Sequence, residues 1–343
     1  MPDDVDLLRL VDQHRLITSR QLLAALGGER DERAFLQRLA KLFHAEYLDR
    51  PPAQNRPGQP ARHFIYALGV NGHRTLFPKL WEHGRPRDVR LENRRLKLQS
   101  LQHEVAVCET VLALHLAAHE QGWTFAWSKG SEFHARSGFP ARIKLPSPIA
   151  GVDSLPLNPD AFVTVRTGEH NVHWFVEVDM STEPQITQNL KRSSICQKVL
   201  AYWTLNVSRL AKFDRKRDSF RALFVTTTAA RLQGMRTAAQ AVDAKRKGAH
   251  FFHFTTQENC SLNDPGKVFY EPVWWTAKQG YDNPRKLFLD TCMRCHQLVD
   301  TGNEPYVLLN SDPPALAFAP GTTPLPDMLP DEPEYAHAQC PGR

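Results

Sequence analysis

Three acidic residues occupy positions at which carboxylates could meet at one end of a β-sheet. Asp160 directly precedes the extended run 161–165, and Glu177 and Asp179 close the extended run 173–178. Side chains two residues apart in a strand share one face, and Asp160 and Glu177 lie at the same end if the two runs pair as a hairpin. Converging carboxylates suit Mg²⁺ or Mn²⁺, which can polarise a phosphodiester and lower the pKa of an attacking water. The alternative is that these acids only cap strand ends.

The elements that must position these acids alternate between helix and strand. The apolar pattern predicts helices at 98–119, 184–205 and 229–247, and strands at 123–128, 161–165, 173–178, 221–227 and 250–255. The order is αβββαβ followed by αβ, which predicts a mixed sheet with helices on its faces. The predicted fold class is therefore α/β.

The first eighty residues have a different pattern. Apolar residues recur at helical spacing in three segments, within 5–11, 22–26 and 34–43, and Thr18 with Gln21 forms a capping box before the second. Two extended runs follow at 46–50 and 63–68, separated by a Pro-rich loop. Three short helices followed by a β-hairpin is the order of a winged helix-turn-helix, in which the hairpin forms the wing.

Basic side chains lie where such a domain would contact duplex DNA. The third helix and the wing loop contribute Arg30, Arg33, Arg38, Lys41, Arg56 and Arg62. These side chains could neutralise phosphates and make binding salt-dependent. The alternative is that they form a solvated face of a dimerisation or docking module, and Asp31 and Glu32 on the same helix weaken the case for tight groove binding.

The acidic motif resembles a known nuclease signature. Asn158-Pro159-Asp160, a spacer of sixteen residues and Glu177-Val178-Asp179 are similar to the Pro-Asp…(Asp/Glu)-x-Lys pattern of the PD-(D/E)xK superfamily, whose core is also αβββαβ. The chain from about residue 5 to 255 resembles the replication-relaxation family of plasmid and mobile-element proteins. The matching features are the N-terminal domain, His103-Glu104, Glu132, residues 175–182, Lys198 and Tyr202. The resemblance implies a role in plasmid replication, relaxation or mobilisation.

One position departs from the nuclease signature, because Asp179 stands where the superfamily usually has lysine. A substitute could come from the following helix, on which Lys191, Lys198 and Tyr202 form one stripe. If the stripe faces the acids, Lys198 replaces the ammonium and Tyr202 can hydrogen-bond phosphate. The alternative is that the lysines are solvated and Tyr202 is a packing residue.

Two further acids complete the candidate metal ligands. The resemblance adds Glu104 on the first core helix and Glu132 after the first core strand to Asp160, Glu177 and Asp179. A glutamate on an amphipathic helix is more often only solvated, so both are weaker candidates than the acids at the strand ends.

Charge and composition suggest the domain organisation. Residues 1–100 contain 18 Lys+Arg against 12 Asp+Glu, and residues 191–247 contain 14 against 3, which favours polyanionic partners. From residue 301 onward the chain has one basic residue, six acids and nine prolines, which predicts a largely irregular tail. We predict a winged helix at 1–80, a charged linker at 81–98, a PD-(D/E)xK-like domain at 99–280 and the tail at 281–343.

Other signals are excluded or remain open. No secretory signal or long apolar run occurs, which predicts a cytoplasmic protein without a membrane span. Cys292-Met293-Arg294-Cys295-His296 matches the haem-attachment pattern, but that chemistry needs export. Zinc would need ligands such as Cys260, Cys340 or His337, and reduced thiols are the simpler interpretation. No P-loop, GxGxxG, HExxH or GxSxG motif is present.

Two functions are therefore predicted from different classes. The first is a metal-dependent DNA-nicking enzyme, an endonuclease or relaxase that uses Mg²⁺ or Mn²⁺. The second is a non-catalytic replication or regulatory factor that uses the nuclease-like fold as a DNA platform, as the missing lysine suggests. Duplex DNA is the expected partner in both, and a second copy of the chain or other replication and mobilisation proteins are further candidates.

Overall fold

The computed structural model divides the chain into two compact units. Unit 1 comprises Met1–Leu116 and Ser261–Asp264, and unit 2 comprises Ala117–Cys260 and Pro265–Arg343. The structure describes residues 4–27, 31–55, 63–82, 88–130, 132–133, 139–149, 152–167, 170–185, 194–207, 219–242, 251–278, 283–287, 306–308, 316–318 and 335–337.

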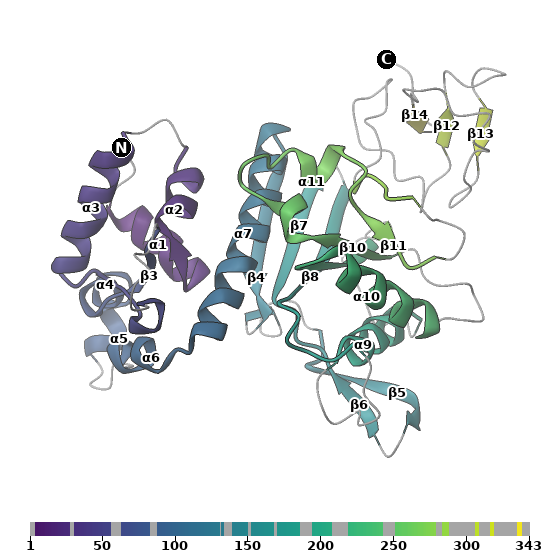
Figure 1. Ribbon diagram of the computed structural model, residues 1–343, viewed down its shortest axis with the longest axis horizontal. Helices are drawn as coiled ribbons and strands as arrows, with labels where there is room; N and C mark the ends of the chain where they lie inside the picture. Colours follow the sequence, from purple (N-terminus) through teal and green to yellow (C-terminus); the bar gives the residue numbers. More distant parts are fainter. Residues whose placement is uncertain are drawn as a thin grey trace. The chain divides into compact units, whose positions relative to one another are not determined.

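Unit 1 consists of helices around a small sheet (Figure 1). Its helices are α1 (Asp4–His14), α2 (Ser19–Ala25), α3 (Glu32–His44), the 3₁₀ turn η1 (Pro52–Gln54), α4 (Val70–Leu76), α5 (Pro78–Glu82) and α6 (Val89–Arg95). Its strands are β1 (Ile17–Thr18), β2 (Leu48–Asp49) and β3 (Ile65–Leu68), paired antiparallel in the order β1-β3-β2. The buried side chains of α1, α2, α3 and β3 form one apolar core.

Local sequence signals determine where the second helix begins. The Thr18 hydroxyl accepts a hydrogen bond from the backbone N–H of Gln21 at 3.2 Å, and the Gln21 side chain accepts one from the Thr18 N–H at 2.9 Å. The predicted capping box is therefore confirmed, and it satisfies two backbone donors that the first turn of a helix leaves unpaired.

Several strands and helices of unit 1 differ from those predicted. The extended runs predicted at 46–50 and 63–68 contain the shorter strands β2 and β3. The two-residue strand β1 and the helices α4, α5 and α6 were not predicted. Helix α6 lies inside the charged run 85–98, and its N-cap Asp88 accepts a hydrogen bond from the Leu91 N–H at 2.9 Å.

Unit 2 is built on a six-stranded mixed sheet. Its strands are β4 (Thr124–Lys129), β7 (Ala161–Thr167), β8 (His170–Asp179), β9 (Ser219–Thr226), β10 (Phe252–Thr256) and β11 (Trp275–Thr276). They lie in the order β11-β10-β9-β8-β7-β4, with β8, β9 and β10 parallel and the outer pairings antiparallel. The predicted α/β class is confirmed.

Helices cover the sheet and bury its aromatic residues. They are α9 (Ile195–Val207), α10 (Ala229–Val242), the turn η3 (Gln257–Cys260) and α11 (Lys267–Tyr270), while α7 (Leu98–Glu120) contains the boundary between the units. On one face of β8, Phe175 contacts Tyr202 of α9 at a ring-centroid distance of 5.2 Å. On the other, Trp174 contacts Phe269 of α11 at 5.8 Å. Helices α9 and α10 pack against each other beside the sheet (Figure 1).

Some elements of unit 2 differ from those predicted. The helix predicted from residue 184 begins at Ile195, and residues 184–185 are not helical. A hairpin of β5 (Arg142–Ile149) and β6 (Val152–Pro156) was not predicted, because its prolines interrupt the alternation expected of strands. In the C-terminal region, β12 (Tyr306–Leu308), β13 (Leu316–Phe318) and β14 (Tyr335–His337) form a small sheet. None of the helices described is both long and apolar enough to cross a membrane.

Candidate active site in unit 2

The pairing of β7 with β8 brings Asp160 beside Glu177. Ala161 lies opposite Val176, and the Asp160 N–H donates to the Val176 carbonyl at 3.0 Å. The Asp160 side chain accepts a hydrogen bond from the Val178 N–H at 2.7 Å. The two carboxylates therefore lie at the same end of the hairpin, which was the condition for a shared site.

A close backbone contact holds the turn before Asp160. The Pro159 carbonyl lies so near Gly130 that a Cβ at this glycine would be 1.7 Å from the oxygen. The Gly130 N–H points to the Asp160 carbonyl at 3.4 Å. Since any side chain at position 130 would push this turn away, the glycine fixes the place of Asp160 relative to β4.

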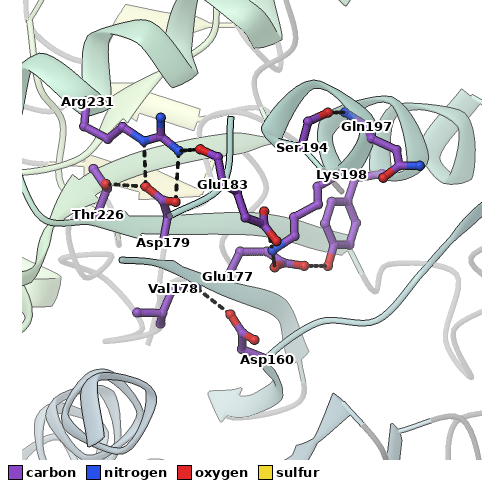
Figure 2. Close-up of polar contacts among 11 residues, drawn as sticks. Asp160, Glu177, Val178, Asp179, Glu183, Ser194, Gln197, Lys198, Thr226 and Arg231 are labelled. Atoms are coloured by element: carbon purple, nitrogen blue, oxygen red, sulfur yellow. Dashed lines mark hydrogen bonds and ion pairs between the residues drawn. The ribbon is translucent and has the colours of Figure 1, made fainter. Parts of the chain in front are cut away.

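Glu177 is the most buried acid of the site, with 2% of its surface exposed. The Tyr202 hydroxyl donates to its Oε1 at 2.5 Å, and the Lys198 ammonium lies 3.0 Å from its Oε2 (Figure 2). Both partners come from α9, where they are four residues apart and so on one face. The predicted stripe of this helix thus contacts Glu177, although its third member, Lys191, lies outside the described residues.

Lys198 is shared between two carboxylates. Its Nζ also lies 3.2 Å from Oε2 of Glu183, which follows β8 in the chain. The first turn of α9 is held by Ser194, whose hydroxyl accepts a hydrogen bond from the Gln197 N–H at 3.2 Å (Figure 2). The Lys198 side chain is 23% exposed, and the two oxygens that its ammonium contacts, Oε2 of Glu177 and Oε2 of Glu183, are both buried.

Burial and neighbouring charges shift the protonation of all three groups. The pKa of Glu177 is raised to about 7, chiefly by burial; the Lys198 ammonium and the Tyr202 hydrogen bond oppose the rise, and the Asp160 charge adds to it. Desolvation lowers the pKa of Lys198, but the carboxylates of Glu177, Asp160 and Glu183 outweigh it and the net shift is upward. Burial and the nearby Glu177 charge also raise the pKa of Tyr202. Near neutral pH, Lys198 is therefore cationic, and Glu177 keeps its proton to a higher pH than an exposed carboxyl group does.

Asp179 has a separate set of partners. The Nε of Arg231 donates to its Oδ2 at 2.8 Å and an Nη of the same guanidinium donates to its Oδ1 at 3.0 Å. The Thr226 hydroxyl donates to Oδ2 at 2.8 Å, and Arg231 also donates to the Glu183 carbonyl. Asp179 points toward Thr226 and Arg231 in Figure 2, while Glu177 points toward α9. Both Asp179 oxygens are thus engaged by hydrogen bonds.

The acids of the site differ in whether their oxygens are available to a divalent metal. In the part of the chain that the structure describes, no group of three or more His, Cys, Asp or Glu side chains could hold a metal ion. Mg²⁺, however, is commonly bound by one or two carboxylates together with waters and substrate phosphates. Asp160 and Glu177 supply the number of carboxylates that such a site uses, but Tyr202 and Lys198 contact the two oxygens of Glu177, and Asp179 is held by Arg231.

The remaining predicted ligands lie elsewhere. Glu104 belongs to unit 1 and lies 3.5 Å from Arg15, with which it forms an ion pair. Glu132 is exposed in a short helical segment after β4. The structure thus brings together Asp160, Glu177, Lys198 and Tyr202.

The predicted DNA-binding residues are only partly described. Arg33 and Lys41 are exposed on α3, and Arg38 forms an ion pair with Asp4 at 2.5 Å. Arg30, Arg56 and Arg62 lie outside the described residues, as do Cys292, Cys295, His296 and Cys340.

The sequence reasoning missed Glu183, Thr226 and Arg231. Arg231 is 52 residues from Asp179, so only the packing of α10 beside β8 brings them together. No local spacing indicates that pairing. Glu183 lies four residues after Asp179. Its carboxylate is the one sequence feature near the acidic motif that could have indicated a further partner for Lys198.

Comparison with known proteins identifies the family. The family model described as replication-relaxation matches residues 8–209. The chain belongs to the replication-relaxation family. This confirms the resemblance drawn from the acidic motif, Lys198 and Tyr202. No curated protein and no solved structure matched the chain.

Proposed function

We propose that this member of the replication-relaxation family is a DNA-binding protein of plasmid or mobile-element replication or relaxation, and that it nicks DNA at the Asp160–Glu177–Lys198 cluster. The proposal rests on one observation. Lys198 places its ammonium 3.0 Å from Glu177 although Asp179 stands at the usual lysine position. A lysine from α9 thus supplies the cation that the signature lacks.

Each residue of the cluster has a distinct task in this proposal. Asp160 and Glu177 would hold a Mg²⁺ or Mn²⁺ ion. Such an ion would lower the pKa of the attacking water and polarise the phosphodiester. Lys198 would stabilise the negative charge that develops on the phosphate. Tyr202 orients Glu177 through its hydrogen bond, so it is a positioning residue.

DNA binding is assigned to unit 1. Its order of three helices, short strands and a connecting loop fits a winged helix-turn-helix, in which α2 and α3 form the reading unit. The exposed side chains of Arg33 and Lys41 on α3 would contact phosphates. Duplex affinity should therefore fall steeply with salt, and Arg33→Ala with Lys41→Ala should reduce that salt dependence. An affinity insensitive to salt would argue against this assignment.

Nicking is tested on supercoiled plasmid with Mg²⁺ or Mn²⁺. Asp160→Asn and Glu177→Gln remove charge that the cation requires, so nicking should fall by orders of magnitude while DNA binding holds or rises. Lys198→Ala should reduce the rate about 100-fold, or ~3 kcal/mol of transition-state stabilisation. Lys267→Ala is the matched control, because Lys267 lies on α11 with a similar exposed fraction and pairs with Glu271.

A second candidate function is a non-catalytic DNA platform. Two observations favour it: Arg231 and Thr226 engage both oxygens of Asp179, and Lys198 and Tyr202 engage both oxygens of Glu177. The same assay separates the candidates. Wild-type protein that binds duplex DNA, relaxes no plasmid with either ion and binds neither ion by calorimetry would reject nicking and support the platform.

A further inference from the structure

A pocket in unit 1 contains three arginine side chains. Its volume is about 410 Å³, and its lining comes from the end of α3, from β2, from the start of α4 and from α6. The arginines are Arg50, Arg90 and Arg94, and the acids that share the lining are Glu46 and Asp49. Neither the cluster in unit 2 nor the predicted contacts of α3 and the wing include these arginines.

Aromatic rings hold Arg50 in place. Its guanidinium carbon lies 4.4 Å from the ring centroid of Phe43, 4.0 Å from that of Phe64 and 5.1 Å from that of Tyr66. One Nη also donates to the Tyr66 hydroxyl at 2.8 Å. The Nε of Arg50 is buried and has no hydrogen-bond acceptor among the described residues. A guanidinium held in this way offers a positive charge in a fixed position to an anionic oxygen, although its buried Nε is not the donor that would meet it.

Helix α6 supplies the other two guanidinium groups. Arg90 and Arg94 are four residues apart and so lie on one face of the helix. Arg90 pairs with Glu46 at 2.5 Å, and both side chains are about half exposed. Arg94 is exposed, and no described residue pairs with it.

The net charge of the pocket indicates the kind of anion. Glu46 offsets Arg90, and Asp49 accepts hydrogen bonds from the Arg50 N–H at 2.8 Å and from Asn93 at 2.9 Å. Three cations and two anions leave an excess of one positive charge among these side chains. A backbone phosphodiester has one negative charge, whereas a nucleoside triphosphate has several. The excess therefore matches a phosphodiester.

We propose that this pocket binds a backbone phosphodiester of duplex DNA. It would give unit 1 a phosphate contact in addition to those of α3, and it would position the protein on the duplex without reading sequence. The inference rests on the DNA-binding part of the proposed function. It does not depend on nicking.

The test measures duplex affinity of the full chain in EDTA, so that no cleavage occurs. Arg90→Ala and Arg94→Ala should each weaken binding about tenfold on any sequence and lower the salt slope by about one. Arg95→Ala is the matched control, because Arg95 is the exposed neighbour on the same helix and does not line the pocket. A smaller loss for Arg95→Ala would show that position, and not total charge, determines the effect.

A substitution that is expected to increase the duplex affinity strengthens the test. Glu46→Gln removes the charge that neutralises Arg90, and it should tighten duplex binding several-fold. All four altered side chains are exposed, and unchanged thermal unfolding would confirm that the fold is intact.

The outcomes distinguish a failure of the pocket assignment from a failure of the DNA-binding function. If the wild-type chain binds no duplex, the DNA-binding function itself fails. If it binds duplex and Arg94→Ala equals Arg95→Ala, only the pocket assignment is overturned. The assignment is also overturned if ATP binds the wild type by calorimetry and Arg94→Ala abolishes that binding while duplex affinity is unchanged, since the pocket would then be a nucleotide site.

Discussion

Glu177 and Asp179 lie two residues apart on the same face of β8, but their surroundings differ. Glu177 contacts an ammonium and a phenol from α9, whereas Asp179 contacts a guanidinium from α10 and a hydroxyl from β9. Glu177 also has a second acid beside it, because Asp160 faces it across the hairpin. One strand thus supplies two carboxylates with different surroundings, one beside a shared ammonium and a second acid and one held by a guanidinium.

The geometry of the cations explains the difference. A guanidinium forms two parallel hydrogen bonds to a carboxylate and stays charged, so it holds Asp179 in one orientation. An ammonium is a point charge on a flexible stem, and Lys198 is shared with Glu183. Glu177 is therefore expected to exchange partners more readily than Asp179 does.

Removing the guanidinium should produce the largest effect. Arg231→Ala leaves the buried Asp179 carboxylate with one hydroxyl donor, and we expect a loss of about 3–5 kcal/mol in the free energy of unfolding. Urea denaturation of the full chain measures it. Lys198→Ala should cost less, because Glu177 can take up a proton once its cation is gone. Equal losses for the two variants would contradict the comparison.

The Glu177 side chain should also make the stability of the fold depend on pH. Its pKa is about 7 in the folded chain against an ordinary value of 4.5, so the folded state retains a proton that the unfolded chain releases between these values. Stability from this group is complete below pH 4.5 and is lost as the pH rises through 7. The wild type should lose about 3 kcal/mol relative to Glu177→Gln across this range.

That measurement is made by urea denaturation in EDTA, so that metal ions do not compete with the proton. The Glu177→Gln variant keeps the shape of the side chain and cannot titrate, which makes it the direct reference. Parallel stability curves for the two proteins would show that Glu177 does not have a raised pKa.

Much of the fold was predictable because local patterns determine it. The capping box at Thr18 and the alternation along β8 each depend on residues a few positions apart. The α9 stripe was predictable for the same reason, since Lys198 and Tyr202 are one helical turn apart. These signals predicted the elements and the face on which the candidate residues lie.

Contacts between distant elements could not be predicted in this way. The pattern of α10 predicts only that Arg231 is an exposed basic residue. Its ion pair with Asp179 depends on the packing of α10 beside the sheet. Asp179→Lys, which would rebuild the usual superfamily lysine, would place an ammonium against Arg231, so it is expected to destabilise the chain and not to test catalysis.

The smallest expected effects compare two hydroxyl donors. Thr226→Val removes one of three hydrogen bonds to Asp179 and should cost about 1 kcal/mol, because Arg231 still engages both oxygens. Tyr202→Phe removes the donor to Oε1 of Glu177, and its cost should grow with pH from about 1 to about 2 kcal/mol, because that hydrogen bond favours the ionised carboxylate. Urea denaturation at pH 5 and pH 8 measures both variants. A cost for Tyr202→Phe that does not change with pH would mean that the phenol packs beside Glu177 without influencing its charge, and the two carboxylates of β8 would then differ only in their cations.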